Sequence, residues 1–363
     1  MAPEAPRDAR SGGDASIFPD VKRLLMCGLV LAAGCSDALE QDTTAGQVVA
    51  VVNTDPATLS LVSASTFSAT AVDLLNAAGR PATVAGRVSV LAVPLPGVDS
   101  TVFLDFGSSG AGRRVQLAVG AGAAGVAIAD DSTAWVANPT NNRATLINYR
   151  TGDTSSIAVG PTPQAVVVTR STLYVVNANL AGGAPAGPGS ISWRTLGGKV
   201  YAFGTIMLTG ADPEFATVGG DSLIYVVSRG TAGAADGRLS IVDPALKQEV
   251  VVINGLGELP GPAMFHPSGR LLIASEREGI LEVNTLTRTL VRGVGAGRKP
   301  GGRGVAALAL DQRGRIYALD RGDCTAPGVV HVLSAPPDYA DLETVSVGAC
   351  PSAAAAVFMQ AAP

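Results

Sequence analysis

The sequence predicts an all-β protein built from repeated sheets, and three observations support that prediction. Short runs rich in Val, Ile, Leu and Tyr alternate with Gly, Pro, Asn and Asp, as strands and turns do. No long segment places apolar residues at the spacing of one helix face. The strand-like runs also recur in the same order, at intervals of about 40–50 residues.

One strand pattern of the type Y-V-V-N defines the repeat. It begins at seven positions: Ala50, Leu91, Trp135, Tyr174, Tyr225, Leu272 and Tyr317. A second strand pattern follows each, as in LSIVDP (239–244), and then a strand that ends in a Gly/Pro turn, as in SSIAVG (155–160). About four strands in each unit is the content of one β-propeller blade. We therefore predict a seven-bladed β-propeller of four-stranded antiparallel blades over residues 47–360, with six or eight blades as alternatives.

The register of the repeat predicts how the ring closes. The first unit begins at Val48 with a Y-V-V-N-type strand, so it lacks an innermost strand. The chain ends in SAAAAVFM (352–359), at the place where an innermost strand belongs. We expect this C-terminal strand to join the first blade beside Val48–Asn53, because closure removes the open sheet edges.

The N-terminal segment carries the pattern of an export signal. Lys22 and Arg23 precede the apolar run Leu24–Gly34, whose 11 residues are too short to cross a bilayer of ~30 Å. The end of this run, LAAGC, resembles the lipobox of bacterial lipoproteins. That resemblance implies that residues 1–34, an N-terminal extension plus signal peptide, are removed and that Cys35 is lipidated. The alternative is a buried helix followed by a free cysteine.

The same resemblance predicts where the protein works. Residues 35–46 become the lipidated cysteine and a polar tether, and the protein is anchored to a membrane at the periplasm or the cell surface. Ser36, rather than Asp, after the cysteine favours the outer membrane by analogy with other lipoproteins. The formal net charge of -4 argues against nucleic acid as a partner.

The repeat motifs also resemble a known family. YVVN, YVVS, WVAN and the turn Gly160-Pro161-Thr162-Pro163 are similar to those of the YVTN-repeat β-propellers, which include lactonase-like and surface-layer proteins. The second unit departs from the pattern, since Pro94 stands where the motif has Asn. The resemblance implies the fold and says little about activity.

Two cysteines remain after the anchor, and the repeat places them at the same end of the ring. Cys324 lies between the second and third strands of the last unit, and Cys350 follows its fourth strand. An oxidising compartment permits a bond, which would stabilise the fold by ~3–4 kcal/mol on the chain-entropy model. Two buried free thiols are the alternative.

The sequence contains few residues that indicate chemistry. It has no G-x-S-x-G elbow, P-loop or calcium loop, so we predict no catalytic residues, metal or cofactor. The basic loop GAGRKPGGRG offers Arg298, Lys299 and Arg303 to an anion, although such loops are often merely solvated. Asn138 and Asn177 are further candidates for a polar ligand, although Asn is also a common turn residue.

These observations favour a binding or scaffold module of the cell envelope, acting as a monomer on a protein partner or polar ligand. The alternative is a lactonase-like hydrolase, for which loop positions nominate Glu214, Glu258 and Arg298. A propeller that holds a quinone cofactor is a third possibility. The fold itself does not choose between them.

Overall fold

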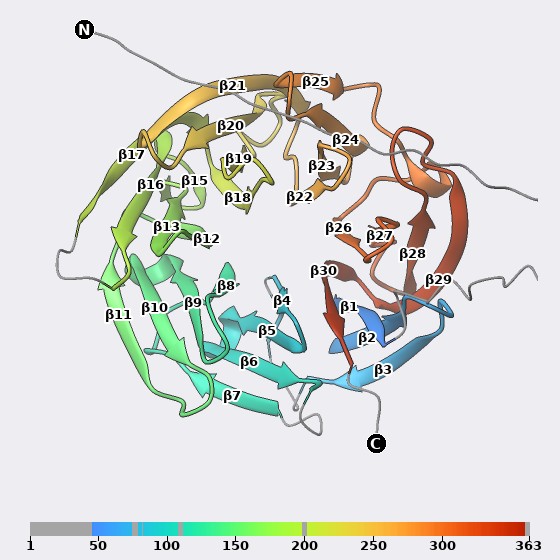
Figure 1. Ribbon diagram of the computed structural model, residues 1–363, viewed down its shortest axis with the longest axis horizontal. Coiled ribbons are helices and arrows are strands. Elements are labelled where there is room, and N and C mark those ends of the chain that lie inside the picture. Colours follow the sequence, from blue (N-terminus) through green and yellow to red (C-terminus); the bar gives the residue numbers. More distant parts are fainter. Residues whose placement is uncertain (1–45, 75–78, 82, 108–111, 198–201, 360–363) are drawn as a thin grey trace, which may run out of the picture. The chain divides into compact units, whose positions relative to one another are not determined.

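The computed structural model describes residues 46–74, 79–81, 83–107, 112–197 and 202–359. They belong to one compact unit, Asp42–Pro363. Within these residues, seven four-stranded antiparallel sheets are arranged in a ring (Figure 1), as the sequence predicts. The predicted lipidation site Cys35, its signal segment 1–34 and most of the tether lie outside the described residues.

The blades are numbered here by the order of their Y-V-V-N strands, and each is given from its innermost to its outermost strand. Blade 1 consists of β30 (Pro351–Phe358), β1 (Gln47–Thr54), β2 (Ala57–Ser63) and β3 (Ala69–Asp73). Blade 2 consists of β4 (Ala85–Arg87), β5 (Val90–Leu95), β6 (Ser100–Asp105) and β7 (Gly112–Gln116). Blade 3 consists of β8 (Val126–Ile128), β9 (Thr133–Asn138), β10 (Arg143–Asn148) and β11 (Thr154–Ala158).

The other four blades follow the same plan. They are β12 (Pro163–Thr169), β13 (Thr172–Asn177), β16 (Pro188–Thr195) and β17 (Phe203–Ala211); β18 (Pro213–Val218), β19 (Ile224–Ser228), β20 (Gly237–Asp243) and β21 (Gln248–Gly257); β22 (Ala263–His266), β23 (Arg270–Ser275), β24 (Gly279–Asn284) and β25 (Thr289–Arg292); and β26 (Ala307–Leu310), β27 (Ile316–Asp320), β28 (Pro327–Leu333) and β29 (Asp341–Ala349). A small hairpin that the sequence did not predict, β14 (Leu180–Ala181) with β15 (Ala184–Pro185), lies in the loop between β13 and β16. Three 3-10 turns complete the described elements: η1 (Pro96–Val98), η2 (Pro139–Asn141) and η3 (Pro300–Gly302).

The ring closes as the register predicts. β30 pairs antiparallel with β1, with Val48 opposite Val357 and Val52 opposite Ala353. The first blade therefore combines the two ends of the described chain, and β1 has no free edge toward the axis. This closure is confirmed.

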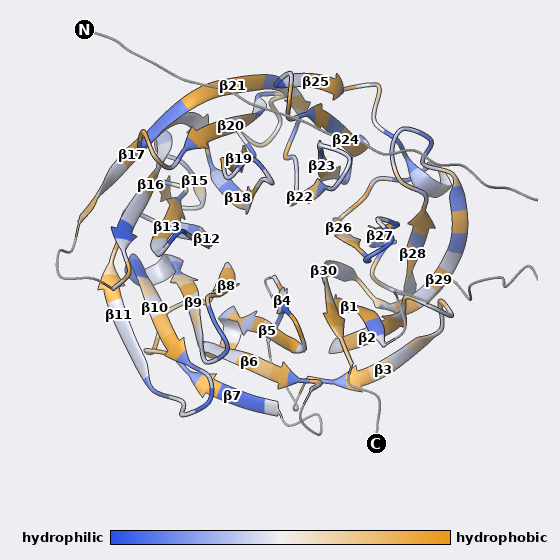
Figure 2. Cartoon of the chain, in the orientation of Figure 1, coloured by the Kyte–Doolittle hydropathy of each residue, from blue (hydrophilic) through white to orange (hydrophobic). Residues whose placement is uncertain are grey.

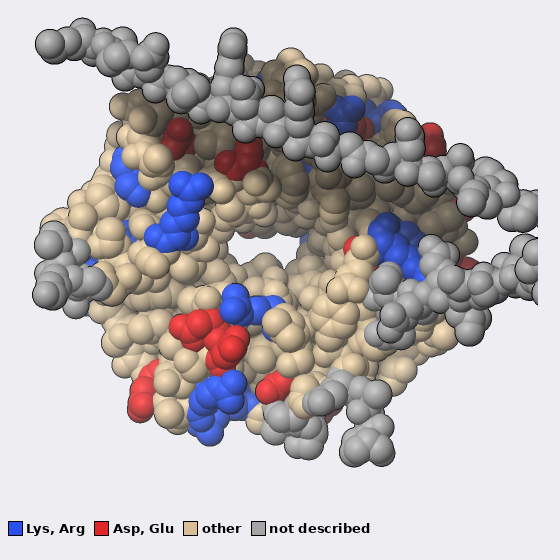
Figure 3. Space-filling view, in the orientation of Figure 1, with Lys and Arg blue, Asp and Glu red and all other residues tan. Residues whose placement is uncertain are grey.

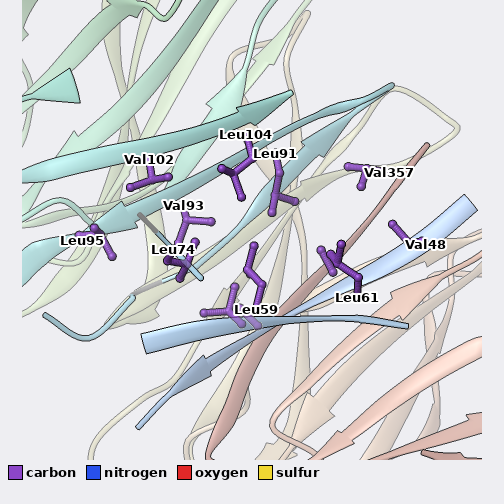
Figure 4. Close-up of a cluster of buried hydrophobic side chains, with 13 residues drawn as sticks. Val48, Leu59, Leu61, Leu74, Leu91, Val93, Leu95, Val102, Leu104 and Val357 are labelled. Carbon is purple, nitrogen blue, oxygen red and sulfur yellow. The ribbon is translucent and has the colours of Figure 1, made fainter. Parts of the chain in front are cut away.

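Hydrophobic packing between adjacent blades holds the ring together. Between blades 1 and 2, for example, Leu59 and Leu61 of β2 pack near Leu91 and Val93 of β5 (Figure 4). Second strands are buried on both faces, whereas an outermost strand such as β29 is largely exposed and carries more hydrophilic residues (Figure 2). This explains why the Y-V-V-N pattern is apolar throughout, since its strand meets a neighbouring blade on each side.

The third strands of three blades end in the same type of turn. Asn148, Asp243 and Asn284 each close such a strand, and a side-chain oxygen accepts hydrogen bonds from the N–H groups two and three residues on. These are Asx-type turns, which Asn and Asp form more strongly than Ser or Thr. The Asn or Asp at the end of the S-I-V-D pattern therefore has a local structural cause.

Candidate binding site at the mouth of the central cavity

A cavity of about 700 Å³ lies at the axis of the ring, and Figure 3 shows the central opening in the view down the axis. The innermost strands line it, together with loops that follow second and fourth strands. Because the strands of a blade are antiparallel, these two loop types emerge at the same end of the ring, here called the upper end. The turns between first and second strands lie at the opposite, lower end.

Two positions of the repeat form the upper wall, and strand pairing aligns them across the blades. In blade order, the first position, at or just before the start of the inner strand, holds Ser352, Thr83, Ala124, Gln164, Glu214, Gly261 and Ala306. The second, directly after the Y-V-V-N motif, holds Thr54, Leu95, Pro139, Ala178, Arg229, Glu276 and Arg321. Among these residues, all four charged side chains belong to blades 5, 6 and 7.

The charged residues that line the cavity are joined in ion pairs. Arg229 Nη1 lies 2.6 Å from Glu214 Oε2, and Arg321 Nη2 lies 2.8 Å from Glu276 Oε1. Arg277 Nε lies 3.1 Å from Glu258 Oε2. We call these six residues the charged rim; with three arginines and three glutamates, its formal charges balance.

Asp212 lies beside the charged rim, and its carboxyl has a raised pKa. Burial raises the pKa of its carboxyl to about 6, the charge of Glu214 adds to the rise, and Arg229 opposes it. At Arg229, burial acts to lower the pKa of the guanidinium, but attraction to Glu214, Asp212 and Glu276 outweighs burial and raises it. A carboxyl that titrates near pH 6 is able to exchange a proton under physiological conditions.

Three polar atoms on the cavity wall have no hydrogen-bond partner among the described residues. They are Arg229 Nε, Arg321 Nε and Ser352 Oγ, each buried at the level of the atom. A buried donor without an acceptor is costly, by ~1–3 kcal/mol in typical cases. An acceptor oxygen would relieve that cost once a small rotation of the side chain turned the atom toward the cavity, so these three atoms are candidate donors to a ligand.

The wall becomes apolar further along the inner strands. It consists there of Val126, Val166, Phe215, Met264 and Leu308, the last from blade 7. On blades 1 to 4, the upper wall is made of small or neutral residues. The cavity therefore joins a charged sector, a neutral sector and an apolar interior, which is the usual combination in small-molecule sites.

The disulfide predicted from the sequence is present. Cys324 and Cys350 are bonded, with their Cα atoms 4.4 Å apart. Cys324 follows Arg321 in the loop after β27, and Cys350 precedes Ser352 at the start of β30. The bond thus joins the two segments that carry Arg321 and Ser352, the residues to which two of these three polar atoms belong.

The basic loop proposed for anion binding is divided between two environments. Arg298 Nη2 lies 2.8 Å from Asp341 Oδ2 on β29, and neither Arg298 nor Lys299 lines a described cavity. Arg303 Nε lies 3.7 Å from Asp320 Oδ2, at a smaller cavity of about 280 Å³ that also touches Glu276 and Arg321. Of the three cations, only Arg303 therefore lies next to the charged rim.

The glycines of this loop serve close packing. A Cβ atom on Gly304 would lie 1.8 Å from the carbonyl oxygen of Glu276, and one on Gly297 would lie 2.1 Å from that of Glu278. The backbone N–H of Arg298 is bonded to Ile280 O rather than aimed at a ligand. The loop 295–304 thus supports the turn that carries Glu276.

The two asparagines predicted to bind a ligand are buried within their own blades. Thr145 Oγ1 donates to Asn138 Oδ1 over 2.5 Å, and Asn177 Nδ2 donates to Ser192 Oγ over 3.1 Å. Both side chains belong to fully buried residues. Each ties the end of a second strand to the third strand, and we assign neither a part in the candidate site.

The two histidines lie away from the charged rim. His266, the last residue of β22, has its Nδ1 2.7 Å from Ser268 Oγ and its Nε2 3.0 Å from Gly314 O. His331 lies on β28, and burial lowers the pKa of its imidazole. In the described part of the chain, no group of three or more His, Cys, Asp or Glu side chains is arranged to hold a metal ion.

Sequence reasoning named Glu214 and Glu258 but missed the arginines of the charged rim. The signal was available in the aligned repeats. The residue after each Y-V-V-N motif is charged in blades 5, 6 and 7 and uncharged in the other four. A charge confined to one repeat position in adjacent blades indicates a single site on the ring.

No helix in the described ranges combines the length and apolarity of a membrane span. No protein-family model matches the chain, and no curated protein matches it in sequence.

Solved structures with a similar fold include three from different bacteria. A functionally unknown protein from Desulfotomaculum acetoxidans is 13% identical, with a TM-score of 0.63 over 86% of this chain and 99% of its own. Apo AztD from Citrobacter koseri is 12% identical, with a TM-score of 0.57 over 87% and 98%. Virginiamycin B lyase from Staphylococcus aureus is 11% identical, with a TM-score of 0.58 over 76% and 87%. At these identities the likeness shows the fold alone.

Proposed function

We propose that this protein is a lipid-anchored propeller of the bacterial cell envelope, related to the YVTN-repeat proteins, and that it binds a polar ligand in its central cavity. The observation that carries the binding role is the charged rim, together with the unpartnered Arg229 Nε and Arg321 Nε at the cavity wall. The cavity volume of about 700 Å³ lies within the ~300–1,000 Å³ range of ligand sites.

The anchor in this proposal is Cys35. A tether of 11 residues, 36–46, reaches at most ~36–40 Å when fully extended, so the ring would stay close to the membrane surface. Replacing Cys35 by alanine is expected to move the protein from the membrane fraction to the soluble fraction of the native cell. Retention of the variant in the membrane fraction would count against the anchor without affecting the binding role.

Hydrolysis remains the alternative function, and one observation favours it. Asp212 and Glu214 form an acidic pair in which the pKa of Asp212 is raised to about 6, as a general acid or base requires. One solved virginiamycin B lyase is described as catalytically inactive after a histidine was replaced by alanine. Here, neither His266 nor His331 lines the cavity. Lactone turnover that disappears in Asp212→Asn would favour the hydrolase.

The binding role is testable in intact cells with a photo-crosslinking amino acid. Gln164 lines the cavity on its neutral side, and Leu286 is 89% exposed in the turn between β24 and β25 at the lower end. We expect a defined product from position 164, none from position 286, and loss of the product in Arg321→Gln. The same products from both positions, or none from position 164, would refute cavity binding.

A further inference from the structure

Resting on the proposed binding role, we propose that the ligand of the central cavity is zwitterionic. It carries a carboxylate and an ammonium group, as a free short peptide does. The arrangement of donors, acceptors and charges along the wall supports this ligand class.

The donors call for a carboxylate. Arg229 uses Nη1 for Glu214 and Arg321 uses Nη2 for Glu276, while the Nε–H of each is buried at the cavity wall and has no partner among the residues that the structure describes. A guanidinium presents several N–H groups in one plane, so it can hold a protein carboxylate and a ligand carboxylate together. Ser352 adds a hydroxyl that likewise has no partner in the described part of the chain.

The acceptors provide a place for an ammonium group. Glu276 occupies the repeat position between Arg229 and Arg321, and its side chain is 56% exposed. Glu258, by contrast, is held at Oε1 by the N–H of Gly233 and by Arg277, and its side chain is only 19% exposed. Glu276 is therefore the carboxylate best able to accept from a ligand cation.

The charge balance argues against a ligand with a large net charge. The cavity wall has three arginines and three glutamates among its described residues. A dianion would be repelled by Glu214, Glu258 and Glu276, and a dication would be repelled by the three arginines. A zwitterion of zero net charge satisfies both signs, and its fixed dipole matches an alternating Arg, Glu, Arg row.

The rest of the cavity wall suits a ligand whose carboxylate and ammonium group are joined by an uncharged segment. Ala124, Gly125, Ala165 and Ala353 leave room on the neutral side, and the apolar residues Phe215 and Met264 continue along the inner strands. A short peptide with small side chains has this distribution of charged ends and apolar middle.

The experiment is isothermal titration calorimetry of the full-length chain with three probes. These are tri-alanine with free ends, N-acetyl-tri-alanine, which lacks the ammonium, and tri-alanine amide, which lacks the carboxylate. We expect the free peptide to bind at least tenfold more tightly than either blocked form. Succinate, a shorter dianion that lacks an ammonium group, should bind more weakly than the free peptide.

Protein variants assign the effect to the rim. Arg321→Gln and Arg321→Lys should each weaken free tri-alanine at least tenfold, because lysine keeps the charge but lacks the Nε–H donor. The matched control is Arg87→Gln at the lower end, where Arg87 Nη2 lies 3.6 Å from Asp131 Oδ1. This control should bind like the wild type, and melting temperatures confirm that each variant is folded.

The outcomes separate the inference from the role on which it rests. Equal binding of all three peptides, tighter binding of succinate, or no binding of any probe would overturn the zwitterionic ligand. If crosslinking from position 164 still captures a ligand in cells, cavity binding survives that failure. If crosslinking also yields nothing, both proposals are wrong.

Discussion

Blades 5, 6 and 7 and blades 1 to 4 share one strand pattern but present different chemistry to the cavity. In both groups the Y-V-V-N strands are buried, and their apolar side chains pack between neighbouring sheets. One residue further on, the first group has Arg229, Glu276 and Arg321, whereas the second has only uncharged residues. The comparison shows that the fold depends on the strand and the candidate site on the residue that follows it. The first can stay constant while the second varies.

Deleting residues 350–363 tests the framework that both groups share, and we expect the largest effect from it. The deletion removes β30, which pairs with β1 along its length and covers blade 1 toward the axis. An open ring loses interblade packing, and we expect this loss to exceed the whole free energy of unfolding, which is typically ~5–15 kcal/mol. We expect no cooperative thermal transition near that of the wild type in circular dichroism. A truncated protein that melts like full length would show that closure is dispensable.

Replacing both Cys324 and Cys350 by serine tests whether their disulfide stabilises the edge of blade 7, the last of the three blades that carry charged residues. Opening this loop should lower the free energy of unfolding by ~3–4 kcal/mol on the chain-entropy model. Denaturant unfolding with and without a reductant measures it, since reductant should destabilise the wild type and leave the double variant unchanged. Insensitivity of the wild type to complete reduction would contradict the prediction.

Asp212→Asn sharpens the comparison because it removes the acid beside the charged rim. The folded-state pKa of about 6 lies above the ordinary value of ~3.9, so the folded protein loses stability as the pH rises through this window. The variant should be more stable than the wild type at pH 7.5, by ~1–2 kcal/mol after allowance for partial exposure, and close to it below pH 4. Asparagine also suits the left-handed backbone at this position, where φ is 50°.

Melting curves of both proteins at pH 4 and pH 7.5 provide the measurement. A stability difference that is the same at both pH values would mean that the carboxyl of Asp212 does not titrate differently in the folded state.

A double-mutant cycle on Glu276 and Arg321 should give the smallest effect. Their side chains are 56% and 39% exposed, so we expect a coupling of only ~0.2–1 kcal/mol from Glu276→Gln, Arg321→Gln and the pair. Chemical denaturation of the wild type and the three variants supplies the four free energies of unfolding that the cycle needs. A coupling of several kcal/mol would mean that the rim exists for stability, and the functional contrast between the two groups of blades would lose its basis.

Much of the framework was predictable because it rests on local patterns. The strand period, the Gly, Pro, Asn and Asp between strands, and the missing inner strand of the first unit are properties of short segments, and they led to seven blades and to the partner of β1. The disulfide followed from the same register. The hairpin β14–β15 was not predicted, because two-residue strands leave no period to detect.

The site was less predictable because it depends on residues far apart in the sequence. Glu276 and Arg321 are 45 positions apart and meet only through blade packing, so each alone looks like an ordinary loop charge. Asn138 and Asn177 show the reverse case. Their type suggested ligand binding, but burial within a sheet gives them a structural partner. Arg303 reaches the edge of the site only through the fold of its loop.

Hydrogen–deuterium exchange of the full-length chain, with and without saturating tri-alanine, tests the central claim most directly. The account predicts slower exchange in the segments after β19, β23 and β27, which carry Arg229, Glu276 and Arg321. The equivalent segments after β5, β9 and β13 should exchange at unchanged rates. Protection spread evenly over all blades, or confined to blades 2 to 4, would contradict a binding site built by the charged rim.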